Sequence, residues 1–507
     1  MSCSAPADQP VDRPVDGAAD RSAVPASAVR RRPWRTAALL LGVLAVLPAS
    51  ALTACDGGVR GTPGGFGVRD PYFPKLGNGG YDVRHYGLTL AYEPGGHRLT
   101  GTAVITARAT QDLSAFDLDL KGLTVEKVTV DGEAARWNRA GQELTVRPRD
   151  EVSAGGTFRT TVRYSGTPVT VTDPDGTEEG WLRTGDGALA LGEPTGSMAW
   201  FPGNHHPSDK ASYEVSVTVP EGLTAVSNGE LRSERTAHGR TTFVWRTAEP
   251  MASYLATLAV GRFEVSRSVT DDGLPVCTAV DPALAADSRA VLAELPEIVA
   301  WEEKTFGPYP FSSTGAIVDR LDGLGYALET QNRPVFPGAP DTGTLVHELA
   351  HQWYGDSVTP ESWRDMWLNE GFATYAEWLW DEDHGGDPAQ RTFDALYDGS
   401  WFDADADGGG EQGAEAMWAF PPAKPPGAAQ LSDSPVYLRG AMVLHKIRQK
   451  VGDEAFLGIL RGWAAAHRHG NADTAGFTAY VEKRAPGEDF SGIWRDWLYG
   501  DGKPDRP

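Results

Sequence analysis

The chain of 507 residues carries 46 lysines and arginines against 69 aspartates and glutamates, which gives a formal net charge of -23 at pH 7. A protein this acidic is repelled by nucleic acid and by anionic membrane surfaces, so its composition argues against a nucleic-acid partner. Hydrophobic residues make up 40% of the sequence, and a chain of this length buries enough core to fold without disulfides.

Residues 30–55 read RRRPWRTAALLLGVLAVLPASALTAC, with an arginine-rich flank, an apolar run and then small residues. This order is typical of an export signal, and Pro48 interrupts the run so that a membrane-spanning helix is marginal. Leu52-Thr53-Ala54-Cys55 resembles a bacterial lipoprotein box, in which Cys55 becomes the lipidated first residue. We expect residues 1–54 to be a signal region and the protein to be exported and lipid-anchored to the outer face of the bacterial cytoplasmic membrane. The alternatives are an ordinary secretory signal, which would release the protein, and an uncleaved anchor.

The next segment, residues 55–80, is rich in glycine with scattered prolines, and this composition predicts a flexible tether. Processing would remove Cys3 and acylate Cys55, so Cys277 would be the only free thiol and no internal disulfide is expected. A lone cysteine of this kind is usually a small buried apolar side chain.

Residues 81–264 alternate apolar and polar side chains and are enriched in β-branched types, as in LTGTAVITARAT at 99–110. This pattern predicts an N-terminal β-sandwich domain. His205 and His206 lie within it, but adjacent side chains on a strand point to opposite faces and cannot easily bind one ion. The neighbouring prolines and glycine predict a surface loop for this pair.

After about residue 265 the periodicity becomes helical, beginning with SRAVLAELPEIVAWEEKTFG at 288–307. In VHELAHQWYGDS, His347 and His351 are four residues apart, so on a helix both imidazoles face one side and can bind one ion. Catalytic zinc usually takes three protein ligands and leaves a fourth position open, and Glu370 can supply the third ligand. Glu348 lies beside the metal as the candidate general base. The sequence therefore predicts one catalytic Zn²⁺ per chain.

The third ligand identifies the kind of zinc site. A metzincin would carry glycine and histidine three and six residues after His351, whereas this chain has Tyr354 and Ser357 there. Glu370 lies instead in WLNEGFATYAEW, which predicts a second helix with apolar residues around the carboxylate.

These motifs resemble the aminopeptidase N type of gluzincin metallopeptidase, on HELAHQW at 347–353, WLNEGFATYAE at 367–377 and the spacing between them. GPYPF at 307–311 and SPVYLRGAMVLHKI at 434–447 fit the same family. The resemblance implies an α+β protein, in which an antiparallel β-sandwich domain at 81–264 precedes a thermolysin-like, mostly helical zinc-peptidase domain at 265–507.

The resemblance also implies roles for individual residues. Tyr437 matches the catalytic tyrosine, which would donate a hydrogen bond to the developing oxyanion. Glu377 matches a residue that hydrogen-bonds a zinc-ligating histidine, and Asn369 is expected to support the metal ligands from behind in the same way. Arg439 stands where the family usually has lysine, which keeps the charge. A solvent-facing helix charge is the alternative for Glu377.

The part of the site that would hold the substrate's amino end departs from the family pattern. Relatives usually read G-x-M-E-N, and this chain has Leu328, Glu329 and Thr330 at the last three positions. Glu329 matches the glutamate that holds a free α-amine. Glu193, in the EPT segment, is a candidate second carboxylate for that amine, and a surface charge at the edge of a sheet is its alternative.

The resulting prediction is a zinc-dependent aminopeptidase that acts at the cell surface on peptides with a free N-terminus. A zinc endopeptidase or another small-substrate hydrolase is the alternative, and a non-catalytic surface binding protein with structural zinc is the remote one. Most relatives continue into a large helical domain that roofs the active site, whereas the resemblance here ends at FSGIWRDWLYGDGKP, residues 490–504. We therefore expect an open cleft with weak control of peptide length.

Overall fold

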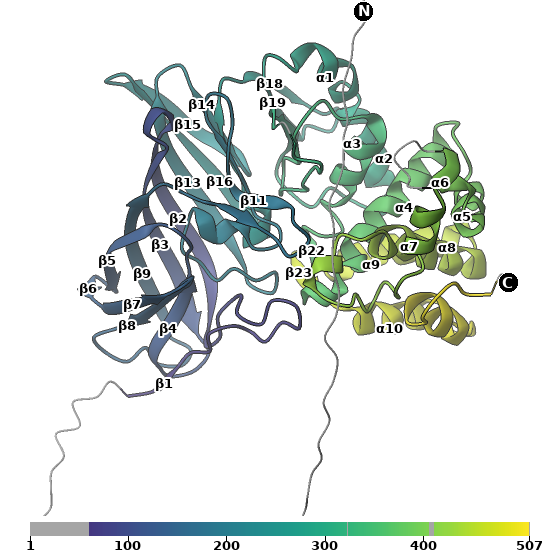
Figure 1. Cartoon of the computed structure of the whole chain (residues 1–507), viewed down its shortest axis with the longest axis horizontal. Coiled ribbons are helices and arrows are strands. Elements are labelled where there is room, and N and C mark those ends of the chain that lie inside the picture. The colour runs from purple at the N-terminus through teal and green to yellow at the C-terminus, as the bar shows by residue number, and fades with distance from the viewer. Residues whose placement is uncertain (1–59, 322, 405–409, 506–507) are drawn as a thin grey trace, which may run out of the picture. The chain divides into compact units, whose positions relative to one another are not determined.

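The computed structural model describes residues 60–321, 323–404 and 410–505 (Figure 1). The predicted signal region at residues 1–54 and the predicted lipidation site Cys55 lie outside these residues. Across the described ranges, no helix has both the length and the apolar character that crossing a membrane requires.

Seventeen strands build the first half of the described chain (Figure 1). They are β1 (Thr62–Pro63), β2 (Tyr81–Glu93), β3 (Arg98–Ala109), β4 (Leu113–Asp119), β5 (Thr124–Val130), β6 (Glu133–Ala134), β7 (Arg136–Ala140), β8 (Glu143–Arg147), β9 (Thr157–Gly166), β10 (Thr170–Thr172), β11 (Glu178–Arg183), β12 (Ala188–Leu191), β13 (Lys210–Pro220), β14 (Thr224–Ser227), β15 (Glu230–Ala237), β16 (Arg240–Ala252) and β17 (Leu258–Gly261). The largest sheet has the order β15-β16-β13-β2-β3-β9-β5-β6, and two smaller sheets have the orders β10-β11-β12-β17-β14 and β1-β4-β8-β7.

The long strands form where apolar and polar side chains alternate in the sequence with a period of two residues. Buried and more exposed side chains alternate along β2 and β13, as expected for a sheet with one face on the core. Most pairs are antiparallel, but β13 runs parallel to β2, with Tyr213 opposite Tyr86. The antiparallel prediction is wrong for this pair because a long stretch of chain, and no hairpin, connects the two strands. The β-rich first half itself is confirmed.

Residues 60–80 do not form the predicted tether. Their strand β1 pairs with β4, and the carboxylate of Asp70 is buried. It accepts hydrogen bonds from the backbone N–H groups of Tyr72 (2.8 Å) and Trp363 (3.0 Å) and from the hydroxyl of Ser362 (2.8 Å). The tether prediction is wrong here because a glycine-rich composition indicates only that the backbone can be flexible. The buried Asp70 carboxylate nevertheless fixes the segment to the second half of the chain.

His205 and His206 do not lie on a surface loop, because both side chains are buried. A ring nitrogen of His205 lies 3.0 Å from the carbonyl oxygen of Phe201, and one of His206 lies 3.4 Å from the Asp70 carboxylate. Burial lowers the pKa of His205 to about 4, so this imidazole stays neutral. The pair has a structural role in the β-rich half.

The second half contains a four-stranded sheet of order β18-β19-β20-β21 and most of the helices. Its strands are β18 (Glu264–Val269), β19 (Pro275–Val280), β20 (Thr314–Val318), β21 (Val335–Phe336), β22 (Val358–Pro360) and β23 (Gly470–Ala472). Its α-helices are α1 (Ala285–Leu292), α2 (Leu295–Phe306), α3 (Thr342–Ala350), α4 (Trp367–Asp383), α5 (Ala389–Asp398), α6 (Ser400–Ala404), α7 (Gly410–Ala416), α8 (Gly440–Val451), α9 (Asp453–Ala466) and α10 (Thr474–Arg484). The short helical turns of the chain are η1 (Pro94–Gly96), η2 (Gly196–Ala199), η3 (Ser253–Leu255), η4 (Trp363–Asp365), η5 (Ala428–Gln430), η6 (Pro435–Arg439) and η7 (Ile493–Leu498).

The buried side chains of both halves belong to one continuous hydrophobic core. Cys277 on β19 is part of it, as a buried free thiol. The predicted mixed α+β class, with a β-rich half followed by a helical half, is therefore confirmed. The sheet that begins at β18 shows that the second half opens with strands and only then becomes helical.

Candidate metal centre and active site

Two helices bring the three predicted ligands together. The Asp341 carboxylate caps the start of α3 by accepting from the backbone N–H of Thr344, at 2.7 Å. His347 lies in the last turn of α3, and His351 follows the end of that helix. Glu370 lies in the first turn of α4, which packs against α3.

The ligand atoms have the spacing of a tetrahedral metal site. Oε2 of Glu370 lies 3.2 Å from Nε2 of His347 and 3.4 Å from Nε2 of His351. Zinc bonds to nitrogen and oxygen of about 2.0–2.2 Å put neighbouring donors roughly 3.3–3.5 Å apart in a tetrahedron. Two imidazoles and one carboxylate with this spacing fit a catalytic Zn²⁺ with an open fourth position.

The other ring nitrogens fix the histidines in the orientation that a metal requires. Nδ1 of His347 donates to Oε1 of Glu377 at 2.6 Å, and Nδ1 of His351 donates to the carbonyl oxygen of Tyr354 at 3.0 Å. Both Nε2 atoms are thereby left to face Glu370. Although burial raises the pKa of the Glu370 carboxyl, the facing His351 and His347, when protonated, lower it to about 2. The carboxylate is therefore ionised and available as a ligand.

Glu348 and Tyr437 lie on the wall of the same cavity. Glu348 is 6% exposed, and its Oε2 has no hydrogen-bond partner among the described residues. Burial raises the pKa of Glu348 to about 8, which suits a group that takes up and returns a proton near neutral pH. Burial likewise raises the pKa of Tyr437 well above its usual range, so its hydroxyl keeps its proton and can donate.

A short π-helix, η6, presents Tyr437 to the cavity, with its ring 6.3 Å from that of His347 and nearly parallel to it. Arg439, at the end of η6, is fully buried and donates to four backbone carbonyl oxygens, among them those of Trp497 and Phe420. The guanidinium group thus fixes the η6 segment through these hydrogen bonds, and Arg439 does not line the cavity.

Glu193 and Glu329 meet beside the metal ligands. Ligand oxygens of Glu193, Glu329 and Glu370 all lie within 4.8 Å of one another. Glu329 is 2% exposed and accepts a hydrogen bond from Nδ2 of Asn369 at 2.9 Å. Burial, and then the charge of Glu329, raise the pKa of Glu193 well above its usual range. A cation placed between these two carboxylates would relieve that repulsion.

The tight approach of Glu193 depends on its neighbour Gly192. A Cβ atom at that position would lie 2.4 Å from the carbonyl oxygen of Tyr254, a distance that no side chain can occupy. Glycine therefore lets the segment after β12 pass close to η3 and turn Glu193 into the cavity.

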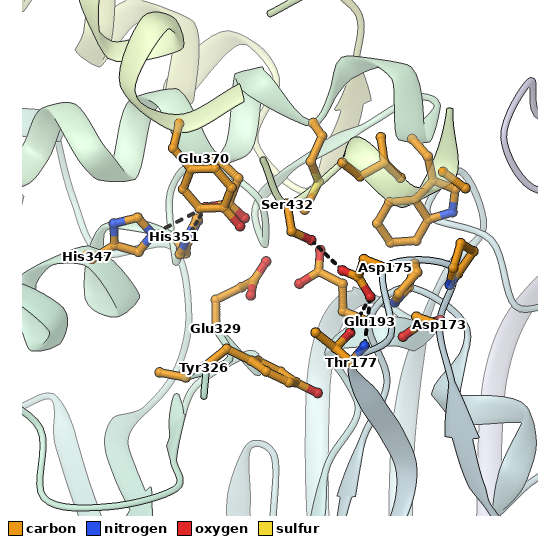
Figure 2. A pocket seen from close by; sticks show the side chains of 18 of the residues that line it. Asp173, Asp175, Thr177, Glu193, Tyr326, Glu329, His347, His351, Glu370 and Ser432 are labelled. Carbon is orange, nitrogen blue, oxygen red and sulfur yellow. Dashed lines mark hydrogen bonds and ion pairs between the residues drawn. The ribbon is translucent and has the colours of Figure 1, made fainter. Parts of the chain in front are cut away.

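The cavity has a volume of about 210 Å³ (Figure 2). Its lining includes all of the predicted ligand, catalytic and amine-holding residues, and also a set that sequence reasoning missed: Asp173, Pro174, Asp175, Thr177, Tyr326, Ala428, Leu431 and Ser432. The missed residues come from the turn between β10 and β11 and from loops far along the chain. The turn sequence TDPDGTEEG signals a hairpin, but nothing local in it points toward the zinc motif.

Known proteins match both halves of the chain. A model of the peptidase M1 N-terminal domain matches residues 83–255, and a model of the peptidase family M1 domain matches residues 341–497. The chain is 26% identical over 341 residues to probable aminopeptidase 2 of Sulfurisphaera tokodaii, covering 62% of this chain and 41% of that one. It is 27% identical over 332 residues to aminopeptidase M1 of Arabidopsis thaliana, covering 62% and 37%. The chain thus spans less than half the length of these curated relatives.

A solved structure agrees over more of its length. The crystal structure of an M1 zinc metallopeptidase mutant from Deinococcus radiodurans, bound to a Tyr-Ser-Ala substrate, is 30% identical with a TM-score of 0.77. That likeness covers 87% of this chain and 99% of that chain.

Proposed function

Because the chain belongs to the M1 family of zinc metallopeptidases, we propose that it is an aminopeptidase that removes the first residue from peptides with a free N-terminus. The observation that carries this proposal is the pair of carboxylates, Glu193 and Glu329, beside the zinc ligand Glu370. The Deinococcus radiodurans relative was solved with the tripeptide Tyr-Ser-Ala, which supports a short peptide as substrate.

The carboxylate pair selects for an amino terminus by charge. The buried Glu329 and the half-buried Glu193 repel each other when both are ionised. A substrate ammonium between them removes the repulsion and gains charge-assisted hydrogen bonds. A peptide with a blocked amine would leave both carboxylates unpaired in a buried site. The oxygens of Glu193 and Glu329 lie within 4.8 Å of an oxygen of Glu370, so a bound α-amine sets the first peptide bond next to the metal site.

His347, His351 and Glu370 would hold the zinc ion, which supplies Lewis acidity to the scissile carbonyl and to a water molecule. Glu348 takes a proton from the attacking water on its carboxylate and delivers it to the leaving nitrogen. Tyr437 donates its phenolic hydrogen bond to the carbonyl oxygen as negative charge develops there.

The test compares an aminoacyl anilide with its N-acetyl form, for the wild type and for Glu329→Gln. We expect the wild type to hydrolyse only the free amine, and the variant to lose most of its turnover of that substrate while it keeps zinc. Equal turnover of both substrates by the wild type would refute the role of Glu329 and favour an endopeptidase.

We also propose that the protein is exported and anchored to the outer face of the bacterial cytoplasmic membrane by a lipid on Cys55. The basic flank, the apolar run and the Leu52-Thr53-Ala54-Cys55 segment support this proposal. Mass spectrometry of the N-terminal peptide should find an acylated Cys55, and Cys55→Ala should remain unprocessed. An unmodified Cys55 in the membrane fraction would contradict the proposal.

A further inference from the structure

The turn between β10 and β11 places a fixed negative charge on the cavity wall. Oδ1 of Asp175 accepts hydrogen bonds from the backbone N–H of Thr177 (2.9 Å) and from its hydroxyl (2.7 Å). Oδ2 accepts from the hydroxyl of Ser432, another lining residue, at 3.2 Å (Figure 2). These bonds hold the carboxylate in one position before any substrate arrives, a preorganisation that favours binding.

A second carboxyl group of the same turn is buried without a full set of partners. Asp173 is only 7% exposed and lines the cavity, and its Oδ2 has no hydrogen-bond partner among the described residues. Burial, and then the charge of Glu179, raise the pKa of Asp173 to about 10, so it carries a proton at neutral pH. A buried polar atom left unpaired costs free energy, and a ligand that hydrogen-bonds to it would recover that cost.

Near the β10–β11 turn, the charged side chains that line the cavity are all acidic. Among the described lining residues there is no lysine or arginine, and the two histidines are the predicted zinc ligands. Burial, and then the charge of Asp175, raise the pKa of Asp433, an exposed acid next to Ser432, so its charge adds to the negative potential near Asp175. In Figure 2, Asp173 and Asp175 lie on the side of Glu193 that faces away from His347. The turn therefore lies beyond the carboxylates that would hold the α-amine.

We propose that Asp175, with Asp173 beside it, binds a cationic side chain on the first residue of the substrate, so that the enzyme prefers arginine and lysine at the N-terminus. This inference rests on the proposed aminopeptidase function, because it assumes that Glu193 and Glu329 hold the α-amine.

The geometry favours the first residue because its side chain leaves the same carbon atom as the α-amine. With that amine between Glu193 and Glu329, the side chain extends into the rest of the cavity. Leu431, Ala428 and the ring of Tyr326 provide apolar surface for a long aliphatic stem. The charged end then reaches the turn, where a guanidinium and a carboxylate form charge-assisted hydrogen bonds.

The test measures kcat/KM for arginyl, leucyl and glutamyl anilides with the wild type, Asp175→Asn and Asp173→Asn. We expect the wild type to prefer the arginyl over the leucyl substrate, and Asp175→Asn to lower that ratio roughly tenfold. The same variant should raise the relative turnover of the glutamyl anilide several-fold, since it removes a repulsive charge. Misfolding cannot produce such a gain.

Glu178→Gln is the matched control. Glu178 is an exposed acid at the start of β11, in the same hairpin, and its side chain does not line the catalytic cavity. Asp175 is exposed as well, and removal of Glu178 deletes the same charge. The arginyl to leucyl ratio should stay within about twofold in this control, because only Asp175 of the two lines the cavity. An equal fall in Glu178→Gln and Asp175→Asn would show only a general effect of net charge and would overturn the inference.

A binding measurement separates this inference from the proposed function. L-argininamide and L-leucinamide are titrated calorimetrically into zinc-loaded Glu348→Gln, with and without Asp175→Asn. Tighter binding of L-argininamide that is lost with Asp175→Asn supports the inference, even if no anilide is hydrolysed and the proposed function fails. Equal binding of the two amides, or a preference that survives Asp175→Asn, overturns it.

Discussion

Replacing Glu377 should weaken zinc binding without touching a ligand. Its Oε1 accepts from Nδ1 of His347 at 2.6 Å, and this bond fixes the tautomer that leaves Nε2 for the metal. Loss of a partner that hydrogen-bonds a metal ligand typically costs 10- to 100-fold in metal affinity or activity, or about 1.4 to 2.8 kcal/mol. Because the Glu377 side chain is 36% exposed, water can partly replace it, and we expect Glu377→Ala near the lower end of that range.

The assay is a competition between the protein and a chelator of known zinc affinity, read as the apparent Kd for Zn²⁺. Glu377→Gln can still accept the hydrogen bond and should lose less affinity than Glu377→Ala. Asp381→Asn is the control, because Asp381 is an exposed acid one turn further along α4. If Glu377→Ala binds zinc as tightly as Asp381→Asn, the hydrogen bond does not support the ligand and this reasoning is refuted.

Three further predictions use other parts of the molecule. Tyr437→Phe should lower kcat about a hundredfold in steady-state kinetics and leave the zinc content unchanged in elemental analysis. A kcat within threefold of wild type would exclude Tyr437 as the donor to the oxyanion. Removal of zinc with a chelator should abolish peptidase activity and lower the Tm, and added Zn²⁺ should restore both; an unchanged Tm would show that the metal does not bind preferentially to the folded state. Glu302 is fully buried, and both its carboxyl oxygens lack hydrogen-bond partners among the described residues. Burial raises its pKa well above the usual range, so the folded state holds a proton that the unfolded state releases. The wild-type free energy of unfolding should therefore fall as the pH rises above the unfolded-state pKa of Glu302. Glu302→Gln should remove up to about 1.4 kcal/mol per pH unit of that slope, measured by urea unfolding between pH 5 and 7. Identical slopes for both proteins would show that Glu302 ionises in the folded state.

The sequence predicted the metal site better than any other part because its residues are local. His347 and His351 are one helical turn apart, and the period of the helix alone places both imidazoles on one side. Glu370 needed only one more assumption, that the next helix packs against the first. The alternation along β2 and β13 predicted the β-rich half by the same kind of local argument.

The errors and omissions arose where contacts between distant segments decide the outcome. Composition predicted a tether at 60–80, but the buried Asp70 accepts hydrogen bonds from Ser362 and Trp363, almost 300 residues away. Asp175 was missed for the same reason, since its partner Ser432 lies 257 residues further along the chain. The periodicity of side-chain types along the sequence carries no information about hydrogen bonds between residues so far apart.

Under the proposed function, residues from both halves of the chain make one zinc motif selective for one end of a peptide. The three metal ligands come from α3, from His351 directly after it and from α4, and α3 also supplies Glu348 for the proton transfer. That set alone fits any zinc peptidase. Glu193 comes from the segment after β12 in the β-rich half, and Glu329 comes from the loop between β20 and β21. Asn369 precedes the ligand Glu370 and hydrogen-bonds Glu329, so the metal site and the amine site share one helix turn. We therefore expect a shift of α4 to disturb metal binding and the proposed amine recognition together. If Asp175 binds the first side chain as proposed, a change in the β10–β11 turn would alter only the preference for that side chain.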